Sequence, residues 1–412
     1  MFGRVHRNLR TALAAALLSI FATPVAAQTL PVAALDEDAA AVADRLGITP
    51  LEAARTLRLQ LASIPATDAI AARFADRLAG MSVEHKPGFR IVVRLTGSEP
   101  VATEWLELAG ERVEAVYVVG APASHTALVQ ALTAHQAAIR ASLIVPPGLG
   151  VDQRTGELVA VVSTRDIARE GAEALRTRLW ELTRVPIRLR VVDDPALDFQ
   201  EDDGIGGGMR MMGSRPGDER RYLCTAGFVV TDGTRDALTT AAHCPDTLSI
   251  RDAAGREAEL PFAGQWGWGY QDVQLNLSAG VLAPTFFTDK ARTARRSVTG
   301  AVGRAATRTG DVVCHRGERT GYSCSQVELT DFAPAGDLCG GACLPTWTTV
   351  AGPSCKGGDS GSPVFLGTTA YGILKGGSYR SGGGCAFYFY MSTDFLPTGW
   401  RLRTIADVQP PA

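Results

Sequence analysis

The sequence predicts two parts, a mixed helical and α/β first half followed by an all-β second half. In the first half, apolar residues recur at helical spacing, and strand patterns then alternate with helix patterns. In the second half, short apolar runs are separated by glycine, aspartate and proline, which is typical of β-sandwiches and barrels. All 8 cysteines lie between Cys224 and Cys385, so disulfides can form in the second half but not in the first.

The overall totals narrow the possible functions. The chain has 412 residues, 46% of them hydrophobic and 20% charged, which is enough for about two to four domains with real cores. The formal net charge is −2, and no basic excess points to nucleic acid or acidic membranes as partners.

Residues 1–27 have the pattern of a signal peptide. Three arginines, at positions 4, 7 and 10, give the chain a positively charged start. An apolar run extends from Thr11 to Phe21, and Val25–Ala27 has the pattern of a small-residue cleavage site. A membrane anchor is the alternative, but Pro24 interrupts the run, which is shorter than the ~20 residues that a spanning helix needs. We therefore expect a secreted or periplasmic protein, in which an even number of cysteines favours disulfides.

Residues 28–200 carry the mixed pattern. In the helical part, residues 35–80, Thr49 can cap a helix whose first turn contains Pro50 and whose apolar spacing continues through Leu61. A second helix is predicted over Thr67–Leu78. An α/β part over residues 85–195 follows, with strands at Phe89–Leu95, Val113–Val119, Leu158–Val162 and Ile187–Val192 and helices at His125–Leu143 and Thr164–Thr183.

The composition changes after Asp193. Asp198–Asp203 is acidic and Gly204–Gly208 is glycine-rich, so residues 201–215 are predicted to be a linker and a candidate processing region. Residues 216–412 form the all-β half, with a short helix near Trp400–Ile405 at its end. The clearest strand patterns are Phe228–Val230, Trp347–Ala351, Val364–Leu366, Ala370–Leu374 and Ala386–Tyr390.

Two segments of the second half carry chemistry. Residues 358–363, GDSGSP, frame a serine with glycines, which let the backbone turn tightly and direct N–H groups at a developing oxyanion. Residues 240–244, TAAHC, supply a histidine that can take the serine proton when a carboxylate orients its ring. A glycine turn between strands is the bland alternative for residues 358–363. The pairing of both segments, in the order His then Ser, favours a nucleophile and its base.

These segments resemble the chymotrypsin family of serine proteases, and more narrowly its secreted bacterial branch of alpha-lytic protease and the streptogrisins. The resemblance covers roughly the second half of the chain, and it implies an all-β protease domain of two antiparallel β-barrels with the active site between them. The first half is similar to that branch in being a large pro-region, which implies a segment that assists folding and inhibits the protease. The motifs that carry the resemblance are residues 224–228, 239–244, 314–317 with 320–324, 355–363 and 371–377.

The resemblance assigns roles to individual residues. Ser360 is the expected nucleophile, His243 the general base and acid, and the N–H groups of Gly358 and Ser360 the oxyanion hole. Asp272 is the expected carboxylate, because it begins an alternating strand pattern between the histidine and the serine. Asp252 is the alternative, but it lies in a turn rich in glycine and alanine and is expected to be solvated.

Other polar residues near these motifs are expected to be structural. His315 follows a cysteine in a turn-like segment, and Asp359 is the residue that in the family pairs with a freed N-terminal amine or another buried partner. A metal site is the alternative use of the histidines and cysteines. Neither His243 nor His315 has a paired-ligand spacing, so we expect no metal and no organic cofactor.

The resemblance also implies a disulfide pattern. The expected bonds are Cys224–Cys244, Cys314–Cys324 and Cys355–Cys385. Cys339 and Cys343 are left over and can pair with each other across Gly340–Ala342.

Three positions depart from the family pattern. Ser362 stands where a second glycine is usual, and Cys355 lies five residues before Ser360, between the animal and bacterial spacings. Lys375 stands where the family usually has a serine close to the catalytic aspartate. This change bears on the hydrogen bonding around the carboxylate.

The substrate pocket is expected to be walled by Ser354, Leu374, Lys375, Gly376 and Gly377. No acidic residue lies near Ser354, so cleavage after lysine or arginine has no support, and a small-to-medium neutral side chain is expected. Lys375 keeps a preference for acidic residues open.

We therefore predict an exported, monomeric serine endopeptidase made as a pre-pro-enzyme. Its expected partners are protein or peptide substrates and its own pro-region in cis. One alternative is an inactive binding protein on a protease fold. Another is an acyl hydrolase acting on esters, although the order His, Asp, Ser differs from that of α/β-hydrolases, in which His comes last.

Overall fold

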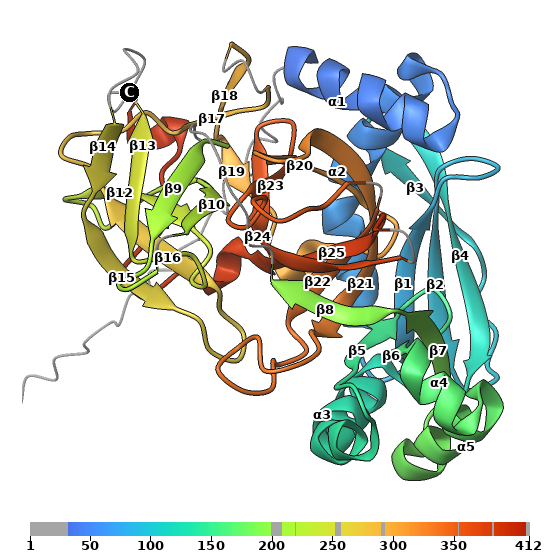
Figure 1. Ribbon diagram of the computed structural model, residues 1–412. Coiled ribbons are helices and arrows are strands. Elements are labelled where there is room, and N and C mark those ends of the chain that lie inside the picture. Colours follow the sequence, from blue (N-terminus) through green and yellow to red (C-terminus); the bar gives the residue numbers. More distant parts are fainter. Residues whose placement is uncertain are drawn as a thin grey trace, which may run out of the picture.

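The structure is a computed structural model that describes residues 32–198, 208–218, 220–251, 257–289, 293–352, 354–380 and 383–408. The predicted signal peptide, residues 1–27, and residues 201–207 of the predicted linker lie outside these ranges. Figure 1 shows two β-barrels side by side, with the first half of the chain packed on the side of the second barrel that faces away from the first barrel.

The first half begins with helices α1 (Val32–Leu46) and α2 (Pro50–Arg73). Thr49 caps α2 as predicted, because its hydroxyl accepts a hydrogen bond of 3.2 Å from the backbone N–H three residues later. The two helices predicted between Thr49 and Leu78 are instead this one helix, which continues through Pro65. Leu59 and Ile70, on either side of Pro65, are buried in one cluster with the adjacent sheet, so tertiary packing stabilises the uninterrupted helix.

A four-stranded sheet follows, in the order β1-β2-β4-β3. Its strands are β1 (Leu78–Glu84), β2 (Arg90–Thr96), β3 (Glu104–Leu108) and β4 (Glu111–Ala121). The strands predicted at residues 89–95 and 113–119 correspond to β2 and β4. β1 and β3 were not predicted, and β1 begins where a helix was expected to end.

A second group of elements completes the first half: α3 (His125–Ser142), β5 (Gly148–Asp152), β6 (Glu157–Ser163), α4 (Thr164–Glu170), α5 (Ala172–Thr183), β7 (Ile187–Val192) and β8 (Asp194–Asp198). The single helix predicted over residues 164–183 is broken at Gly171, whose φ of +83° favours glycine. Helices α3 and α5 pack on β5 and β6 through a buried cluster that includes Leu132, Leu149 and Leu179.

The first barrel consists of two antiparallel sheets, in the orders β10-β9-β13-β14 and β15-β16-β12-β11-β26. Its strands are β9 (Arg210–Ser214), β10 (Arg221–Thr225), β11 (Val229–Thr231), β12 (Asp236–Thr240), β13 (Thr247–Arg251), β14 (Glu257–Leu260), β15 (Phe262–Trp266), β16 (Val273–Leu277) and β26 (Arg401–Leu402). Strand β9 lies inside the predicted linker, residues 201–215, so the barrel begins earlier in the chain than expected.

The second barrel is a closed ring of six antiparallel strands in the order β20-β23-β24-β25-β22-β21, in which β21 pairs back with β20. Its strands are β20 (Val312–Gly317), β21 (Gly321–Ala333), β22 (Trp347–Ala351), β23 (Pro363–Leu366), β24 (Thr369–Tyr379) and β25 (Cys385–Ser392). The all-β double antiparallel barrel after a helical and α/β region confirms the predicted fold class.

Short elements connect the barrels and end the chain. They are β17 (Thr285–Phe287), β18 (Arg295–Ser297), β19 (Gly300–Ala301) and 3₁₀ turns at Arg304–Ala306, Thr393–Phe395 and Ile405–Asp407. The helix predicted near residues 400–405 is wrong, because β26 pairs there with β11 and only a single 3₁₀ turn follows.

Backbone pairing joins the first half to the second barrel. β5 runs antiparallel to β21, with Val151 opposite Asp331 and Leu149 opposite Ala333. The sheet β5-β6-β7 therefore continues the wall of the barrel, as Figure 1 shows. β8 makes a second attachment, to β24, which is described with the site below.

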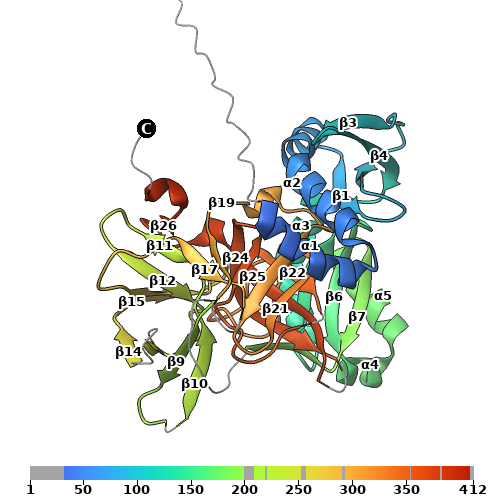
Figure 2. The ribbon, with the colours of Figure 1, turned by 90° about the horizontal axis from the view of Figure 1, so that it is seen from above.

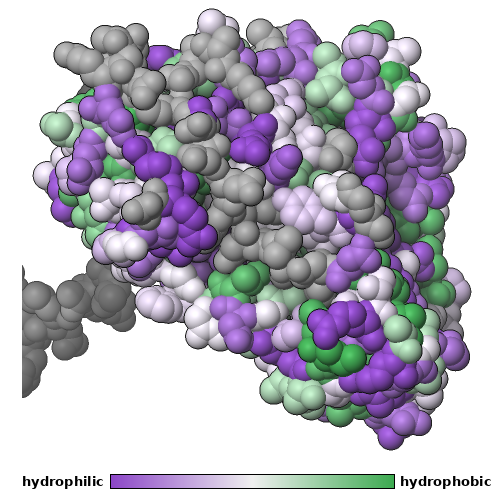
Figure 3. Space-filling model, in the orientation of Figure 1, coloured by the Kyte–Doolittle hydropathy of each residue, from purple (hydrophilic) through white to green (hydrophobic). Residues whose placement is uncertain are grey.

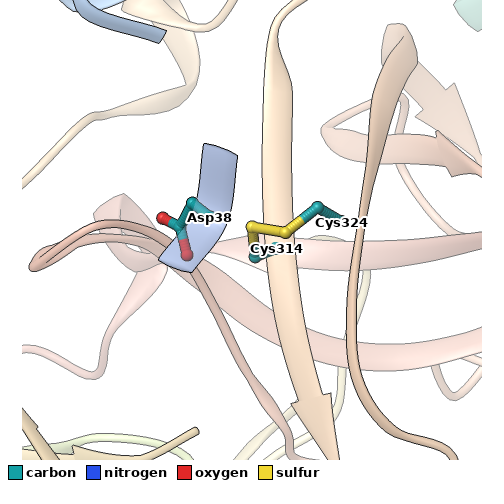
Figure 4. A group of neighbouring side chains, drawn as sticks. All are labelled: Asp38, Cys314 and Cys324. Atoms are coloured by element: carbon teal, nitrogen blue, oxygen red, sulfur yellow. A yellow bond between two sulfur atoms is a disulfide. The ribbon is translucent and has the colours of Figure 1, made fainter. Parts of the chain in front are cut away.

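Helix α1 makes a third attachment through Asp38; Figure 2 shows α1 lying over the second barrel. The carboxylate is buried, lies 2.7 Å from Arg296 Nη1, and accepts hydrogen bonds from the Gly367 N–H at 2.5 Å and from the Tyr322 hydroxyl. Figure 4 shows it beside Cys314–Cys324, whose sulfurs are bonded to each other, so this group is not a metal site. Burial raises the pKa of Asp38, although Arg296 acts in the opposite direction.

The surface adds two observations. Within the described ranges, no helix combines the length and the apolar character that crossing a bilayer requires. Figure 3 shows hydrophilic and hydrophobic residues intermixed on the face of Figure 1, with no broad apolar area among the coloured residues.

Candidate active site

His243, Asp272 and Ser360 come together where the two barrels meet. His243 follows β12 and Asp272 precedes β16 of the first barrel, whereas Ser360 lies in the turn before β23 of the second barrel. His243 Nε2 is 2.8 Å from Ser360 Oγ, and Nδ1 is 3.1 Å from Asp272 Oδ2. The serine and the aspartate are buried, and 12% of the histidine side chain is exposed. This geometry can move a proton from a serine to a histidine whose ring is oriented by a carboxylate.

The histidine segment is fixed to neighbouring backbone. The disulfide Cys224–Cys244 ties the residue after His243 to the end of β10. The Thr240 hydroxyl donates a hydrogen bond of 2.8 Å to the Thr225 carbonyl, and Arg215 Nη2 donates one of 3.0 Å to the His243 carbonyl. The backbone on both sides of His243 is therefore fixed, which limits where its ring can lie.

The serine turn requires its glycines. Gly358 has φ +100°, and a Cβ there would lie 2.5 Å from Leu223 Cδ2; Gly361 has φ +88°, and a Cβ there would lie 2.2 Å from the Thr225 carbonyl oxygen. Thr225 also clamps the turn. Its Oγ1 donates to the Gly358 carbonyl at 2.7 Å, and its N–H donates to the Ser360 carbonyl at 2.7 Å.

The second half is similar in sequence to a curated protease. Over 169 residues, 40% of this chain, it is 30% identical to Streptogrisin-C of Streptomyces griseus, and it spans 35% of that protein's length. No protein-family model matches the chain. This similarity supports a bacterial chymotrypsin-like serine protease as the kind of protein that this part of the chain resembles.

The solved structures that match part of the chain include two proteases. Thermobifida fusca protease A is 25% identical with a TM-score of 0.38, and the match covers 48% of this chain and 98% of that one. Nocardiopsis protease is 23% identical with a TM-score of 0.38, covering 48% of this chain and 99% of that one.

In the same turn as Ser360, Asp359 is held by the backbone and side chains around it. It accepts hydrogen bonds from the N–H groups of Arg319 at 3.0 Å and Lys356 at 2.9 Å, and from the N–H and hydroxyl of Thr320 at 3.1 and 2.8 Å. The resemblance allowed either a freed N-terminal amine or another buried partner for Asp359, and these donors are such a partner. Burial nevertheless raises the pKa of Asp359 to about 6, against the effect of those hydrogen bonds. Ser362, in place of the usual glycine, donates to the Asp359 carbonyl at 2.5 Å and so fits the turn.

The charge beside the histidine is set by a buried ion pair. Lys375 Nζ lies 3.2 Å from Asp272 Oδ1, and each side chain is 1% exposed. Burial acts to raise the pKa of Asp272, but the Lys375 ammonium and then His243 outweigh it, and the pKa is lowered to about 2. The carboxylate is thus ionised at any pH at which the domain would be assayed.

The same contact corrects the predicted pocket. Lys375 was expected to wall the pocket and to leave an acidic preference open, but its ammonium is paired with Asp272 in the interior and faces no substrate. Leu374 was also expected there, and its side chain is part of the hydrophobic core of the second barrel. Ser354, which is half-buried, and the glycines at 376–377 remain as candidate wall residues.

The edge of β24 at residues 376–379 is covered by β8, a strand of the first half. β8 runs antiparallel to it, with Asp198 opposite Gly376 and Leu197 opposite Gly377. The Lys375 carbonyl, one residue before this pairing, is 3.4 Å from Ser360 Oγ. A strand of the first half therefore lies close to Ser360.

The remaining polar candidates lie elsewhere. His315 is buried in β20, edge-on to Tyr388 at 4.7 Å between ring centres, and burial lowers its pKa to about 4. This placement agrees with a structural role. Asp252, the alternative carboxylate, lies outside the described residues.

The three expected disulfides, Cys224–Cys244, Cys314–Cys324 and Cys355–Cys385, are formed, and the two cysteines left over, Cys339 and Cys343, are bonded to each other. Two features near the site were missed from the sequence. β8 precedes an acidic stretch and has no strand pattern of its own, so no local signal could have found it. The Lys375–Asp272 pair did leave a signal, namely a lysine in the otherwise apolar and glycine-rich segment 371–377.

Proposed function

We propose that the chain is the precursor of an exported serine endopeptidase, a monomer whose protease domain hydrolyses peptide bonds. The observation that carries this proposal is the pair of contacts that His243 makes, 2.8 Å to Ser360 Oγ and 3.1 Å to Asp272 Oδ2. Export is supported by the four disulfides, which persist in oxidising compartments, together with the leader predicted at residues 1–27.

In the acylation step, Ser360 Oγ attacks the scissile carbonyl while His243 Nε2 takes its proton. The developing oxyanion is stabilised by the N–H groups of Gly358 and Ser360, and losing one such donor typically costs ~3 kcal/mol in the barrier. His243 then gives its proton to the leaving amine, and the acyl-enzyme remains on the serine.

In the deacylation step, water replaces the amine and the same groups act in reverse. Asp272 accepts the Nδ1–H of His243, which keeps Nε2 free to act as the base. Because Asp272 is ionised well below neutral pH, it can stabilise the imidazolium that forms in both steps.

The first half, residues 28–200, would act as a pro-region. β8 occupies the edge of β24 beside Ser360, so a peptide substrate that adds to that edge by antiparallel pairing must displace it. The pairing of β5 with β21 and the Asp38–Arg296 contact support a role as a folding template for the second barrel. Non-local β-pairing is slow to form unaided, which gives such a template its purpose.

The substrates would be proteins or peptides. With Lys375 paired in the interior, no described charged side chain of the predicted wall supports a charged preference, and a small-to-medium neutral residue before the scissile bond is the expected choice.

Active-site labelling tests the proposal. A fluorophosphonate should label the secreted protein on Ser360, and Ser360→Ala should abolish labelling, whereas Ser249→Ala, on a strand of the first barrel, should not. An unlabelled wild-type protein with an intact fold would favour an inactive binding protein. Labelling with turnover of esters but not of peptides would favour an acyl hydrolase.

A further inference from the structure

The buried ion pair beside the triad is the feature that the proposed mechanism leaves unused. Lys375 lies in the middle of β24, and its ammonium ends against Asp272 and over the ring of Trp347, 5.7 Å from the ring centre. Only 1% of the Lys375 side chain is exposed. A charged lysine is rarely buried to this extent unless it has a partner.

The two oxygens of Asp272 have different neighbours. Oδ2 is the closer oxygen to His243 Nδ1, at 3.1 Å, whereas Oδ1 is 3.4 Å from that nitrogen and 3.2 Å from Lys375 Nζ. We propose that Lys375 is a positioning residue of the triad, whose ammonium binds Oδ1 and thereby holds the carboxylate with Oδ2 toward His243. This inference rests on the proposed function.

A neutral side chain could also orient the Asp272 carboxylate. The positive charge of Lys375 has a further effect, which acts on the imidazole of His243. The two distances to Oδ1 place Nζ and Nδ1 at most 6.6 Å apart, which is their sum. At that separation a permanent positive charge opposes a second proton on the imidazole. Replacing Lys375 by a neutral residue should therefore change the pH dependence of a reaction that uses His243 as its base.

Other charged groups near the histidine act differently. Arg215 contacts its backbone carbonyl rather than its ring. Asp359 follows the serine turn but directs its carboxylate to the backbone of Arg319 and Thr320. Among the charged groups whose contacts are known in the described residues, Asp272 and Lys375 thus face the ring most directly, and of these two only Lys375 carries a positive charge.

The test is the pH dependence of fluorophosphonate labelling, measured on protein produced from the full-length gene. The labelling rate falls on the acid side as His243 gains a proton, so the midpoint of that limb reports the histidine in the free enzyme. In Lys375→Met, which keeps much of the side-chain volume, the midpoint should move up by about one to two pH units. Lys375→Ser should shift it in the same direction.

Two comparisons separate charge from packing and from general damage. A shift in Lys375→Ser but not in Lys375→Met would overturn the proposal, since it would reflect lost volume. Arg403→Met breaks a different ion pair, with the buried Asp236 at 2.8 Å, and should leave the midpoint unchanged. An equal shift in Arg403→Met would also overturn the proposal.

The outcome is independent of the proposed protease activity. If wild-type protein is labelled and both Lys375 variants keep its midpoint, the positioning role is wrong and the protease assignment stands. If wild-type protein is not labelled at any pH, the protease assignment itself fails. Should the variants accumulate poorly, the labelling rate per active site still gives the midpoint.

Discussion

Replacing Asp38 by alanine should loosen α1 from the second barrel. In the intact chain its buried carboxylate binds the Arg296 guanidinium at 2.7 Å, the Gly367 N–H at 2.5 Å and the Tyr322 hydroxyl. Removing one partner of a buried ion pair typically costs ~3–5 kcal/mol, because the other charge is left in the interior. Arg296 would keep Glu37, at 2.6 Å, and the Gly367 carbonyl, at 3.1 Å, so we expect the lower end, about 3 kcal/mol.

Hydrogen exchange can measure this loss. The experiment uses Ser360→Ala as its background, so that the chain cannot cut itself, and follows α1 peptides by mass spectrometry. A cost of about 3 kcal/mol corresponds to amide exchange roughly a hundredfold faster, if α1 opens locally. Asp36→Ala, an exposed aspartate on the same helix, is the matched control. Exchange in Asp38→Ala within about threefold of that control would refute the argument that this contact anchors the helix.

Three further predictions concern the triad, the disulfides and the first half. Asp272→Asn should leave the fold intact and lower turnover by roughly 10⁴, measured as kcat on any cleaved peptide, through the wrong histidine tautomer; near wild-type turnover would mean that another carboxylate orients the ring. Replacing both cysteines of Cys224–Cys244 by serine should cost roughly 2–5 kcal/mol in denaturant unfolding and lower activity. The same change in Cys339–Cys343, with a sequence separation of 4 rather than 20, should cost less, and the reverse order would contradict the chain-entropy reasoning. Residues 205–412 refolded alone should give little active enzyme, and residues 28–200 added as a separate chain should restore it. Full specific activity without the added chain would show that the first half has another role.

Local chemistry made much of the site predictable. The glycines of residues 358–363 and the histidine of residues 240–244 act through backbone geometry within a few residues, so their spacing in the sequence carries the signal. Asp272 was predictable because a strand, β16, begins directly after it. Helix ends with side-chain caps, such as that of α2 at Thr49, were predictable for the same reason.

Contacts between distant segments were not predictable. Two helices were predicted on either side of Pro65, a residue that removes a helical hydrogen bond, but the burial of Leu59 and Ile70 against one sheet keeps them as a single helix. Lys375 was assigned to the wall of the substrate pocket together with the residues next to it in the chain. Nothing local indicates that its side chain crosses to Asp272, which lies more than a hundred positions earlier in the chain.

The pairing of β5 with β21 has a consequence for the second half if the proposed pro-region is removed. While β5 is attached, the backbone of residues 331–333 is covered; once it leaves, those N–H and C=O groups form an open sheet edge, the kind of surface through which β-proteins aggregate. The exposed stretch is short, and its first residue carries a charge. Asp331 loses His125, a first-half partner at 2.8 Å, but keeps Arg304 of the protease domain at 2.7 Å. A short edge that carries a fixed ion pair resists sheet-to-sheet association, so removal of the first half, as proposed, would leave this edge of β21 protected.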